Sequence, residues 1–289
     1  MDEQKYKNLK LGERGAIISI VAYLFLSALK LFVGYEANSE ALRADGLNNA
    51  TDIVASVAVL IGLKLSQRPP DHDHRYGHFK AESVASLVAS FIMMGVGIHV
   101  LIEAITTIFS RGNEAPDMIS AWTGVFSAGV MYFVYRYNRN LAKQINSQAV
   151  MAASKDNISD AWVSIGTAIG IFGAQLGLAW LDPLAAFLVG ILICKTAWEI
   201  FREASHHLTD GFDEKELESY EESVLSIYGV EDVKVIRARN YGNNSVVDIV
   251  IGVNAKLDIT DAHDISTKVE EILLHKHGVY DAHVHVEPN

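Results

Sequence analysis

Apolar residues recur in six long runs before about residue 205, and shorter polar segments separate these runs. Each run is about as long as the roughly 20 helical residues that cross the ~30 Å hydrocarbon core of a bilayer. A helix of this length satisfies its backbone hydrogen bonds internally, as lipid requires. The pattern therefore predicts a multi-pass bundle of six transmembrane helices. The expected spans are residues 15–35, the apolar stretch after Asp45, and residues 83–110, 118–135, 161–180 and 183–201.

A different pattern follows the last apolar run. Two segments have the helical spacing of apolar residues, and three others alternate apolar and polar residues as strands do. The order α-β-β-α-β predicts two helices on one face of a three-stranded sheet, a small α+β domain of the ferredoxin-like kind. The helical segments are residues 213–228 and 261–276, and the strands are residues 233–239, 245–253 and 282–288.

The change of pattern divides the chain into two expected domains. Residues 1–208 form the transmembrane domain, and residues 209–289 form the α+β domain. At about 80 residues the second domain has a modest core, so pairing with a second copy would stabilise it.

Charge is distributed as unevenly as apolar content. The net charge of the 289 residues is −11, and residues 209–289 alone hold 17 acidic and 7 basic residues. An acidic surface of this kind repels nucleic acid, so no nucleic-acid partner is expected, whereas divalent cations suit it.

Basic residues mark one side of the membrane. They gather in the N-terminal segment and in the loops at 64–80 and 136–143, whereas the opposite loops hold only Arg43 and Arg111. Because cytoplasmic loops carry an excess of Lys and Arg, both termini are predicted to be cytoplasmic, in a multi-pass protein of the cell membrane.

The stretch DGLNNATD brings two carboxylates and two amides to the second span. Its polar residues follow the spacing i, i+3, i+4, i+7 and therefore share one face of a helix. A carboxylate at the bilayer centre costs about 2.5–3.5 kcal/mol on insertion scales, so such residues normally face a bundle interior or a water-filled path. The alternative is a helix end at the membrane surface, capped by Asp and Asn. The four residues are Asp45, Asn48, Asn49 and Asp52.

The segment SKDNISDAWVSI at the fifth span repeats this pattern without a gap. If the two spans pack together, three carboxylates and one amide oxygen face a common point, each pair one helical turn apart. That arrangement predicts a cation site. Unneutralised carboxylates in a low dielectric hold protons, so binding of a divalent ion should release protons, and the reverse. The four residues are Asn48, Asp52, Asp156 and Asp160.

These features resemble the cation diffusion facilitator (CDF) family over essentially the whole chain. The resemblance rests on the six spans, the segments DGLNNATD and KDNISD, the loop YGHFKAES, the terminal HVHVEP and the α-β-β-α-β tail. It implies a homodimer in the lipid bilayer that exports divalent transition metals from the cytoplasm by alternating access, driven by inward proton movement. It also implies that residues 1–208 are the transport domain and that residues 209–289 are a cytoplasmic dimerisation or regulatory domain.

The resemblance places the transport site on Asn48, Asp52, Asp156 and Asp160. Zinc-transporting members have a histidine in the span-five pair, whereas this chain has none there. Carboxylate and amide oxygens suit harder ions such as Mn²⁺, so the set resembles the manganese branch of the family. The alternatives are export of Zn²⁺, Fe²⁺, Co²⁺ or Cd²⁺, and a metal-gated sensor or channel without coupled transport. Asp45, nearly two turns from Asp52, is expected to line the exit path.

The same resemblance implies two further metal sites and one ion pair. For the loop site the alternative is a solvated polar loop, and for the ion pair it is two ordinary juxtamembrane charges. In the tail, Lys234 and Val250 stand where the family often has histidines, so the alternative is a tail that dimerises without metal. The residues are Asp71, His74 and His78 in the loop, His263, His285 and Glu287 in the tail, and Lys80 with Asp210 in a charge interlock near the dimer interface.

Neither a resident cofactor nor an enzymatic activity is expected, because the sequence shows no pairing of a nucleophile with a base. The expected partners are a second copy, lipid, divalent metal ions and protons. His99 and Glu103, at i and i+4 of the third span, are interpreted as interior or boundary polar residues near the far end of that helix rather than as a second ligand pair. Lys30, inside the first span, is interpreted as snorkelling or as facing the bundle.

Overall fold

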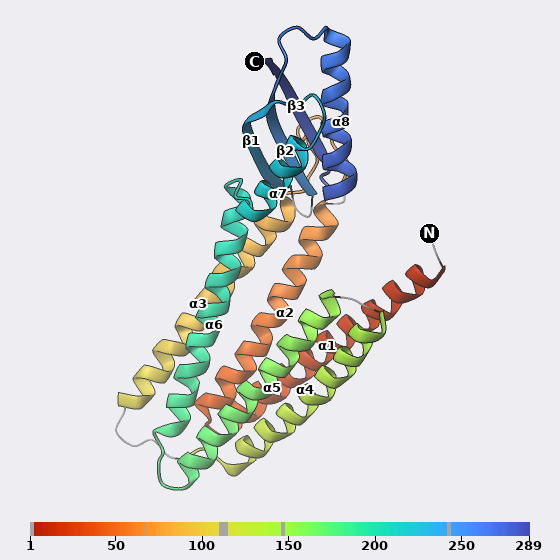
Figure 1. Cartoon of the computed structure of the whole chain (residues 1–289). Coiled ribbons are helices and arrows are strands. Elements are labelled where there is room, and N and C mark those ends of the chain that lie inside the picture. Colours follow the sequence, from red (N-terminus) through yellow and green to blue (C-terminus); the bar gives the residue numbers. More distant parts are fainter. Residues whose placement is uncertain (1–2, 67, 110–114, 146–147, 242–243) are drawn as a thin grey trace. The chain divides into compact units, whose positions relative to one another are not determined.

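The computed structural model describes residues 3–66, 68–109, 115–145, 148–241 and 244–289 (Figure 1). In these residues six long helices precede a three-stranded sheet and two further helices, so the predicted order of elements is confirmed. The chain divides into two compact units, Met1–Val57 with Ala89–Glu199 and Ala58–Val88 with Ile200–Asn289. The elements are α1 (Glu3–Glu36), α2 (Glu40–Ser66), α3 (Ala81–Phe109), α4 (Met118–Ile145), α5 (Gln148–Gln175), α6 (Leu181–Leu208), α7 (Glu214–Leu225), β1 (Asp232–Tyr241), β2 (Asn244–Val253), α8 (Ile259–His277) and β3 (Asp281–Pro288).

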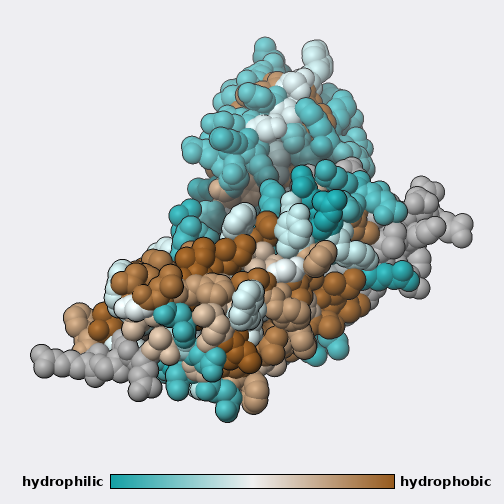
Figure 2. Space-filling model, turned by 90° about the horizontal axis from the view of Figure 1, so that it is seen from below, coloured by the Kyte–Doolittle hydropathy of each residue, from teal (hydrophilic) through white to brown (hydrophobic). Residues whose placement is uncertain are grey.

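Within the described residues, five helices are long and apolar enough to cross a membrane, namely α1, α2, α3, α4 and α6. Helix α5 has a comparable length of 28 residues, but polar residues in its first half lower its apolarity. Large apolar side chains such as Phe25, Phe32 and Phe133 are exposed on α1 and α4, and Figure 2 shows wide areas of hydrophobic surface. Such surface is suited to contact with lipid.

Helix α2 begins at Glu40, so DGLNNATD lies inside this helix and the interpretation as a capped helix end is wrong. The cap is Ser39, whose Oγ accepts a hydrogen bond from Leu42 N at 3.1 Å. Asp182 of α6 completes the cap, since its carboxylate accepts hydrogen bonds from Ser39 Oγ and from Glu40 N, both at 2.7 Å. A partner distant in the sequence therefore sets the start of the helix.

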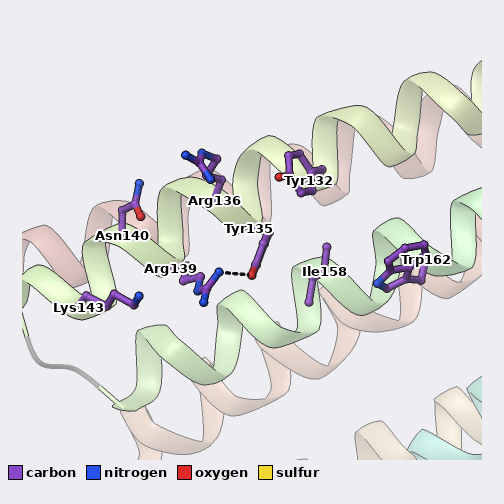
Figure 3. A pocket seen from close by; sticks show the side chains of 8 residues that line it. All are labelled: Tyr132, Tyr135, Arg136, Arg139, Asn140, Lys143, Ile158 and Trp162. Atoms are coloured by element: carbon purple, nitrogen blue, oxygen red, sulfur yellow. Dashed lines mark hydrogen bonds between the residues drawn. The ribbon is translucent and has the colours of Figure 1, made fainter.

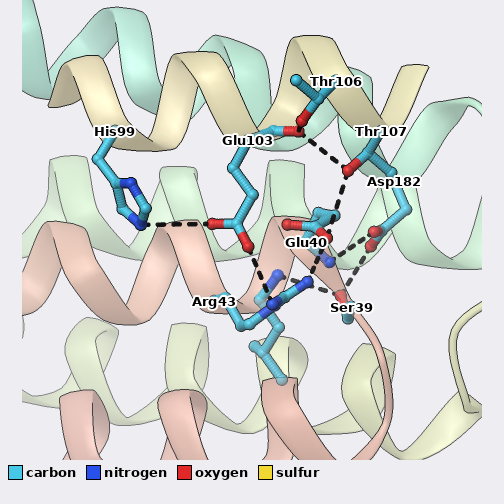
Figure 4. A network of polar contacts seen from close by, with 9 residues as sticks. Ser39, Glu40, Arg43, His99, Glu103, Thr106, Thr107 and Asp182 are labelled. Carbon is cyan, nitrogen blue, oxygen red and sulfur yellow. Dashed lines mark hydrogen bonds and ion pairs between the residues drawn. The ribbon is translucent and has the colours of Figure 1, made fainter. Parts of the chain in front are cut away.

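A network of polar contacts joins α2 to α3 in the same region (Figure 4). Arg43 pairs with Glu40 one turn back, and its Nη1 lies 3.1 Å from Glu103 Oε1. The other oxygen of Glu103 lies 3.8 Å from His99 Nε2. His99 and Glu103 are therefore members of an interhelical ion-pair network.

Helix α5 covers residues 148–175 rather than the predicted 161–180. Its polar first half contains neither Gly nor Pro before Gly166, so nothing in this segment interrupts a helix. The helix ends at Gln175, Gly177 in the following turn adopts φ 94°, and the Leu178 N–H donates to Gly173 O at 3.3 Å. This pairing satisfies a free carbonyl at the end of the helix.

Helices α1, α4 and α5 pack closely together in the first unit. Their shared core includes Leu26 of α1, Met131 of α4 and Ala161 of α5. Helices α4 and α5 approach closely at Gly124. A Cβ added there would lie only 3.1 Å from Ala168 Cβ of α5, so a small residue is needed at this contact. Close approach of this kind is how transmembrane helices gain packing contacts in lipid.

The tail forms a sheet of order β1-β2-β3, in which β1 and β2 are antiparallel and β2 and β3 are parallel. The parallel pair requires a crossover, which α8 provides. Val224 of α7, Val269 and Leu273 of α8, and Ile249 and Ile251 of β2 are buried in one core. Both helices therefore pack on the sheet, as the sequence predicts.

Candidate metal transport site

The polar motifs of α2 and α5 meet in the first unit. Asn48 Nδ2 lies 3.3 Å from Asp160 Oδ1, and Asp160 is 8 % exposed. One residue from each predicted ligand pair is therefore in contact with one from the other pair. The other two predicted ligands, Asp52 and Asp156, are each one helical turn from these two along their own helices.

The three carboxylates differ in their surroundings. Asp52 is partly buried, and its Oδ2 is shielded from solvent with no hydrogen-bond partner among the described residues. Asp156 is exposed, whereas Asp160 is buried. The oxygen atoms of these three carboxylates do not all lie within 4.8 Å of one another. Among the described residues, a group that close is found instead in the loop between α2 and α3. An ion would have to draw Asp52 and Asp156 towards the Asn48–Asp160 contact.

A second layer of polar side chains holds Asp160. The Tyr23 hydroxyl of α1 donates to Asp160 Oδ2 at 2.7 Å and accepts from Asn157 Nδ2 at 3.1 Å. Asn157 Oδ1 in turn accepts from Asn138 Nδ2 of α4 at 2.9 Å. Sequence analysis did not identify Tyr23, Asn138 or Asn157 as site residues. The polar hydroxyl of Tyr23 within the apolar run of α1 is the signal that it overlooked.

Asp45 belongs to a buried ion pair. Lys30 Nζ lies 2.9 Å from Asp45 Oδ1, and both side chains have no exposed surface. Lys30 also donates to Asn49 Oδ1 at 2.7 Å and to Ser164 Oγ at 2.9 Å. Lys30 therefore faces the bundle. Asp45 does not line an open path as expected, because its charge is enclosed with that of Lys30.

The predicted loop site is assembled within the second unit. Asp71, His74 and His78 each place one potential ligand atom within 4.8 Å of the others. Asp71 Oδ1 lies 3.2 Å from His74 Nδ1, and Asp71 Oδ2 lies 3.4 Å from His78 Nε2. Hydrogen bonds from the backbone, chiefly from His74 N at 2.7 Å, lower the pKa of Asp71 and favour its charged form.

The same loop contacts the tail domain within the second unit. Lys80 Nζ lies 2.8 Å from Asp210 Oδ1 and 5.1 Å from the centre of the Tyr241 ring. Phe79 packs edge-on against Tyr280, with ring centroids 5.8 Å apart. The loop is thus attached to the tail by both charge and aromatic contacts.

The predicted tail site is not assembled within one protomer. His285 Nε2 lies 3.7 Å from Glu287 Oε1, but Lys234 Nζ lies 3.2 Å from the other oxygen of Glu287. His263 is exposed on α8 and forms no ligand group with these residues in the described part of the chain. The Lys234 ammonium group thus lies beside this carboxylate together with the His285 imidazole.

Comparison with known proteins matches both parts of the chain to sequence profiles. Residues 16–209 match a profile described as cation efflux transmembrane domain. Residues 212–289 match one described as cation efflux protein, cytoplasmic domain, whose short name denotes a dimer.

Three relatives from Bacillus subtilis (strain 168) match over nearly the full chain. The manganese efflux system protein MneS is 57% identical over 285 residues, which cover 99% of this chain and 98% of MneS. The uncharacterized transporter YdbO is 53% identical over 286 residues, with 99% of each chain covered. The manganese efflux system protein MneP is 32% identical over 288 residues, covering 96% of this chain and 97% of MneP. The chain therefore belongs to the cation efflux family of membrane transporters, the cation diffusion facilitators.

Proposed function

We propose that this protein exports Mn²⁺ from the cytoplasm across the cell membrane by alternating access, in exchange for protons. The observation that carries the proposal is the 3.3 Å contact between Asn48 and Asp160, which brings the two polar motifs to one place. The names of MneS and MneP, which describe manganese efflux, support the choice of ion.

The ligand set favours manganese over softer ions. Asn48, Asp52, Asp156 and Asp160 offer only oxygen atoms, and such ligands suit Mn²⁺, whereas imidazole suits Zn²⁺. Asp156 is exposed and Asp160 is buried, so an ion that enters from solvent would meet the Asp156 carboxylate before that of Asp160. Ligand carboxylates must lose protons to bind metal, so Mn²⁺ and protons compete for the same oxygens.

The proposal includes the organisation of the protein. A transport domain at residues 1–208 and a cytoplasmic domain at 209–289 would form a homodimer, with both termini in the cytoplasm. The group of Asp71, His74 and His78 would be a second, exposed metal site, and the three tail residues discussed above would bind metal only if Lys234 were displaced. No cofactor is needed, because the divalent ion is the cargo.

Flux into proteoliposomes tests the function directly. With an imposed pH gradient, Mn²⁺ uptake by inside-out protein should follow the direction and size of the gradient. Asp52→Ala or Asp160→Ala should abolish uptake, whereas Glu199→Gln, at an exposed pair on α6, should leave it unchanged. Asn48→Asp or Asp156→His should shift the preference towards Zn²⁺.

The outcomes separate the competing functions. Mn²⁺ flux that ignores the pH gradient would reject proton exchange and favour a channel. Full Mn²⁺ transport by Asp160→Ala would reject the assignment of the transport site. A preference of the wild-type protein for Zn²⁺ would reject Mn²⁺ as the transported ion.

A further inference from the structure

A groove on the first unit lies between α4 and α5, apart from the transport site (Figure 3). Its volume of about 470 Å³ falls within the range of small-molecule binding sites. Six of its lining residues come from α4 and two from α5. They are Tyr132, Tyr135, Arg136, Arg139, Asn140, Lys143, Ile158 and Trp162.

The groove is strongly cationic. Arg136, Arg139 and Lys143 follow the spacing i, i+3, i+7 and share one face of α4, and no Asp or Glu lines the groove with them. Arg139 is held in place, because its Nη1 donates to the Tyr135 hydroxyl at 2.9 Å and its guanidinium lies 5.7 Å from the Tyr135 ring centre. In the described part of the chain, no carboxylate forms an ion pair with Arg136 or Lys143.

The polarity of the groove changes along its length. Figure 3 shows Lys143, Asn140 and Arg139 towards one end, and Tyr132 and Trp162 towards the other. The polar end lies near the end of α4, at Ile145. At 1.5 Å per residue, Tyr132 lies roughly 16 Å deeper along the helix than Lys143. A charged end near the helix terminus and an aromatic end at greater depth match the two parts of a phospholipid.

The α5 side of the groove faces away from the transport site. Ile158 and Trp162 are each two residues from Asp160, about 200° around the helix. Trp162 is 66 % exposed whereas Asp160 is 8 % exposed. Trp162 therefore lies on the face of α5 opposite Asp160, and the groove opens away from the contact between Asn48 and Asp160.

We propose that this groove binds one anionic phospholipid, with its phosphate between Arg136, Arg139 and Lys143. Guanidinium groups bind phosphate through paired hydrogen bonds, and a lysine adds a point charge. The acyl chains would run past Ile158 and along Tyr132 and Trp162, at the deeper end of the groove. The inference needs only the membrane location and does not depend on the ion or its coupling.

Quenching of Trp162 by lipids with brominated acyl chains tests the proposal. Trp122, Trp180 and Trp198 are replaced by Phe in the full-length protein, so that Trp162 reports alone. In mixed bilayers, brominated phosphatidylglycerol should quench Trp162 at a lower mole fraction than brominated phosphatidylcholine. A preference of about fivefold or more is expected, since each basic residue near a membrane surface contributes a factor of about five towards anionic lipid.

A matched pair of triple variants separates the groove from general surface charge. The preference for phosphatidylglycerol should disappear in the groove variant, which combines Arg136→Gln, Arg139→Gln and Lys143→Gln. It should persist in the control variant, which combines Lys64→Gln, Arg68→Gln and Arg75→Gln. Equal quenching of the wild type by the two lipids would overturn the proposal without any variant. Loss of the preference in both triple variants would also overturn it. So would displacement of the anionic lipid in detergent by millimolar inorganic phosphate, because the ligand would then be a soluble phosphate.

Discussion

Asp160 is the most constrained carboxylate of the candidate transport site. Its Oδ1 contacts the Asn48 amide and its Oδ2 accepts a hydrogen bond from Tyr23, so helices α1, α2 and α5 all act on one side chain. Groups behind a ligand fix its orientation, and their loss typically weakens metal binding. We therefore expect Tyr23 to position Asp160 if this carboxylate binds metal.

Removal of the Tyr23 hydroxyl should weaken manganese transport without unfolding the protein. A hydrogen bond to a charged group contributes about 1.5–3 kcal/mol, so Tyr23→Phe should raise the KM for Mn²⁺ by roughly 10- to 100-fold. Flux measured across a series of Mn²⁺ concentrations would show this. Tyr35→Phe is the control, because Tyr35 lies on the same helix and is 62 % exposed. Equal KM values for both variants would remove Tyr23 from the site.

The enclosed Lys30–Asp45 pair should matter to stability more than any exposed pair. Lys30→Met leaves the Asp45 charge buried alone, which costs about 3–5 kcal/mol, whereas removal of both charges costs much less. Denaturation in detergent should therefore show a large loss of unfolding free energy for Lys30→Met. The double variant Lys30→Met/Asp45→Leu should recover much of that free energy. Lys195→Ala is the control, since its pair with Glu199 is largely exposed. Similar stability of Lys30→Met and Lys195→Ala would contradict this account.

Sequence analysis identified ligand candidates but not what holds them. Asp52 and Asp160 stand out because a carboxylate is costly in an apolar span. Tyr23 carries no such signal, and its partner Asp160 lies 137 positions further along the chain. Which polar side chains meet depends on how helices pack, and a periodic pattern in one helix contains no information about its neighbour.

At the scale of elements, the existence of each helix was easier to predict than its bounds. Apolar periodicity predicted all the helices and strands of the described chain. It placed the start of α5 too late, because a helix with a polar face resembles a loop until its neighbours are known. Likewise, the start of α2 depends on Asp182, which is 143 positions from Ser39.

The close contact of α4 with α5 should be sensitive to added volume at one glycine. A Cβ at Gly124 would lie 3.1 Å from Ala168 Cβ and 3.3 Å from Ser164 O, whereas a Cβ at Gly129 has no atom within 4 Å. Overpacking costs typically about 1–3 kcal/mol. Gly124→Val should therefore lower the melting temperature in detergent more than Gly129→Val. The second variant is a matched control, because it makes the same change of residue, and so of helix propensity, on the same helix. Equal decreases in melting temperature for the two variants would show that the close approach of α4 and α5 at Gly124 does not contribute to stability.

At the scale of the whole molecule, the predicted architecture is confirmed, with a helical membrane part followed by an α-β-β-α-β tail. The sequence predicted the pair of Lys80 with Asp210, which the structure shows at 2.8 Å, but not the aromatic contacts between this loop and the tail. Phe79 packs against Tyr280 and Lys80 lies near Tyr241, and neither tyrosine stands in a motif that the sequence analysis used.

Loss of this attachment should slow transport, because the loop leads directly into α3. Asp210→Ala leaves Lys80 without its partner, so the rate of Mn²⁺ flux should fall. The exchanged pair Lys80→Asp with Asp210→Lys should recover part of it, since a partly exposed pair tolerates reversal. Glu214→Ala, close by and exposed, is the control. Unchanged flux in Asp210→Ala would show that the pair has no part in transport.

The contact between Lys234 and Glu287 gives the tail a permanent internal counter-ion. The ammonium group is part of the chain, so its local concentration does not vary with the supply of manganese in the cell. A solute ion can reach this carboxylate only by competing with a tethered neighbour 3.2 Å away. Glu287 is thereby neutralised within the chain itself, without a metal ion at this carboxylate.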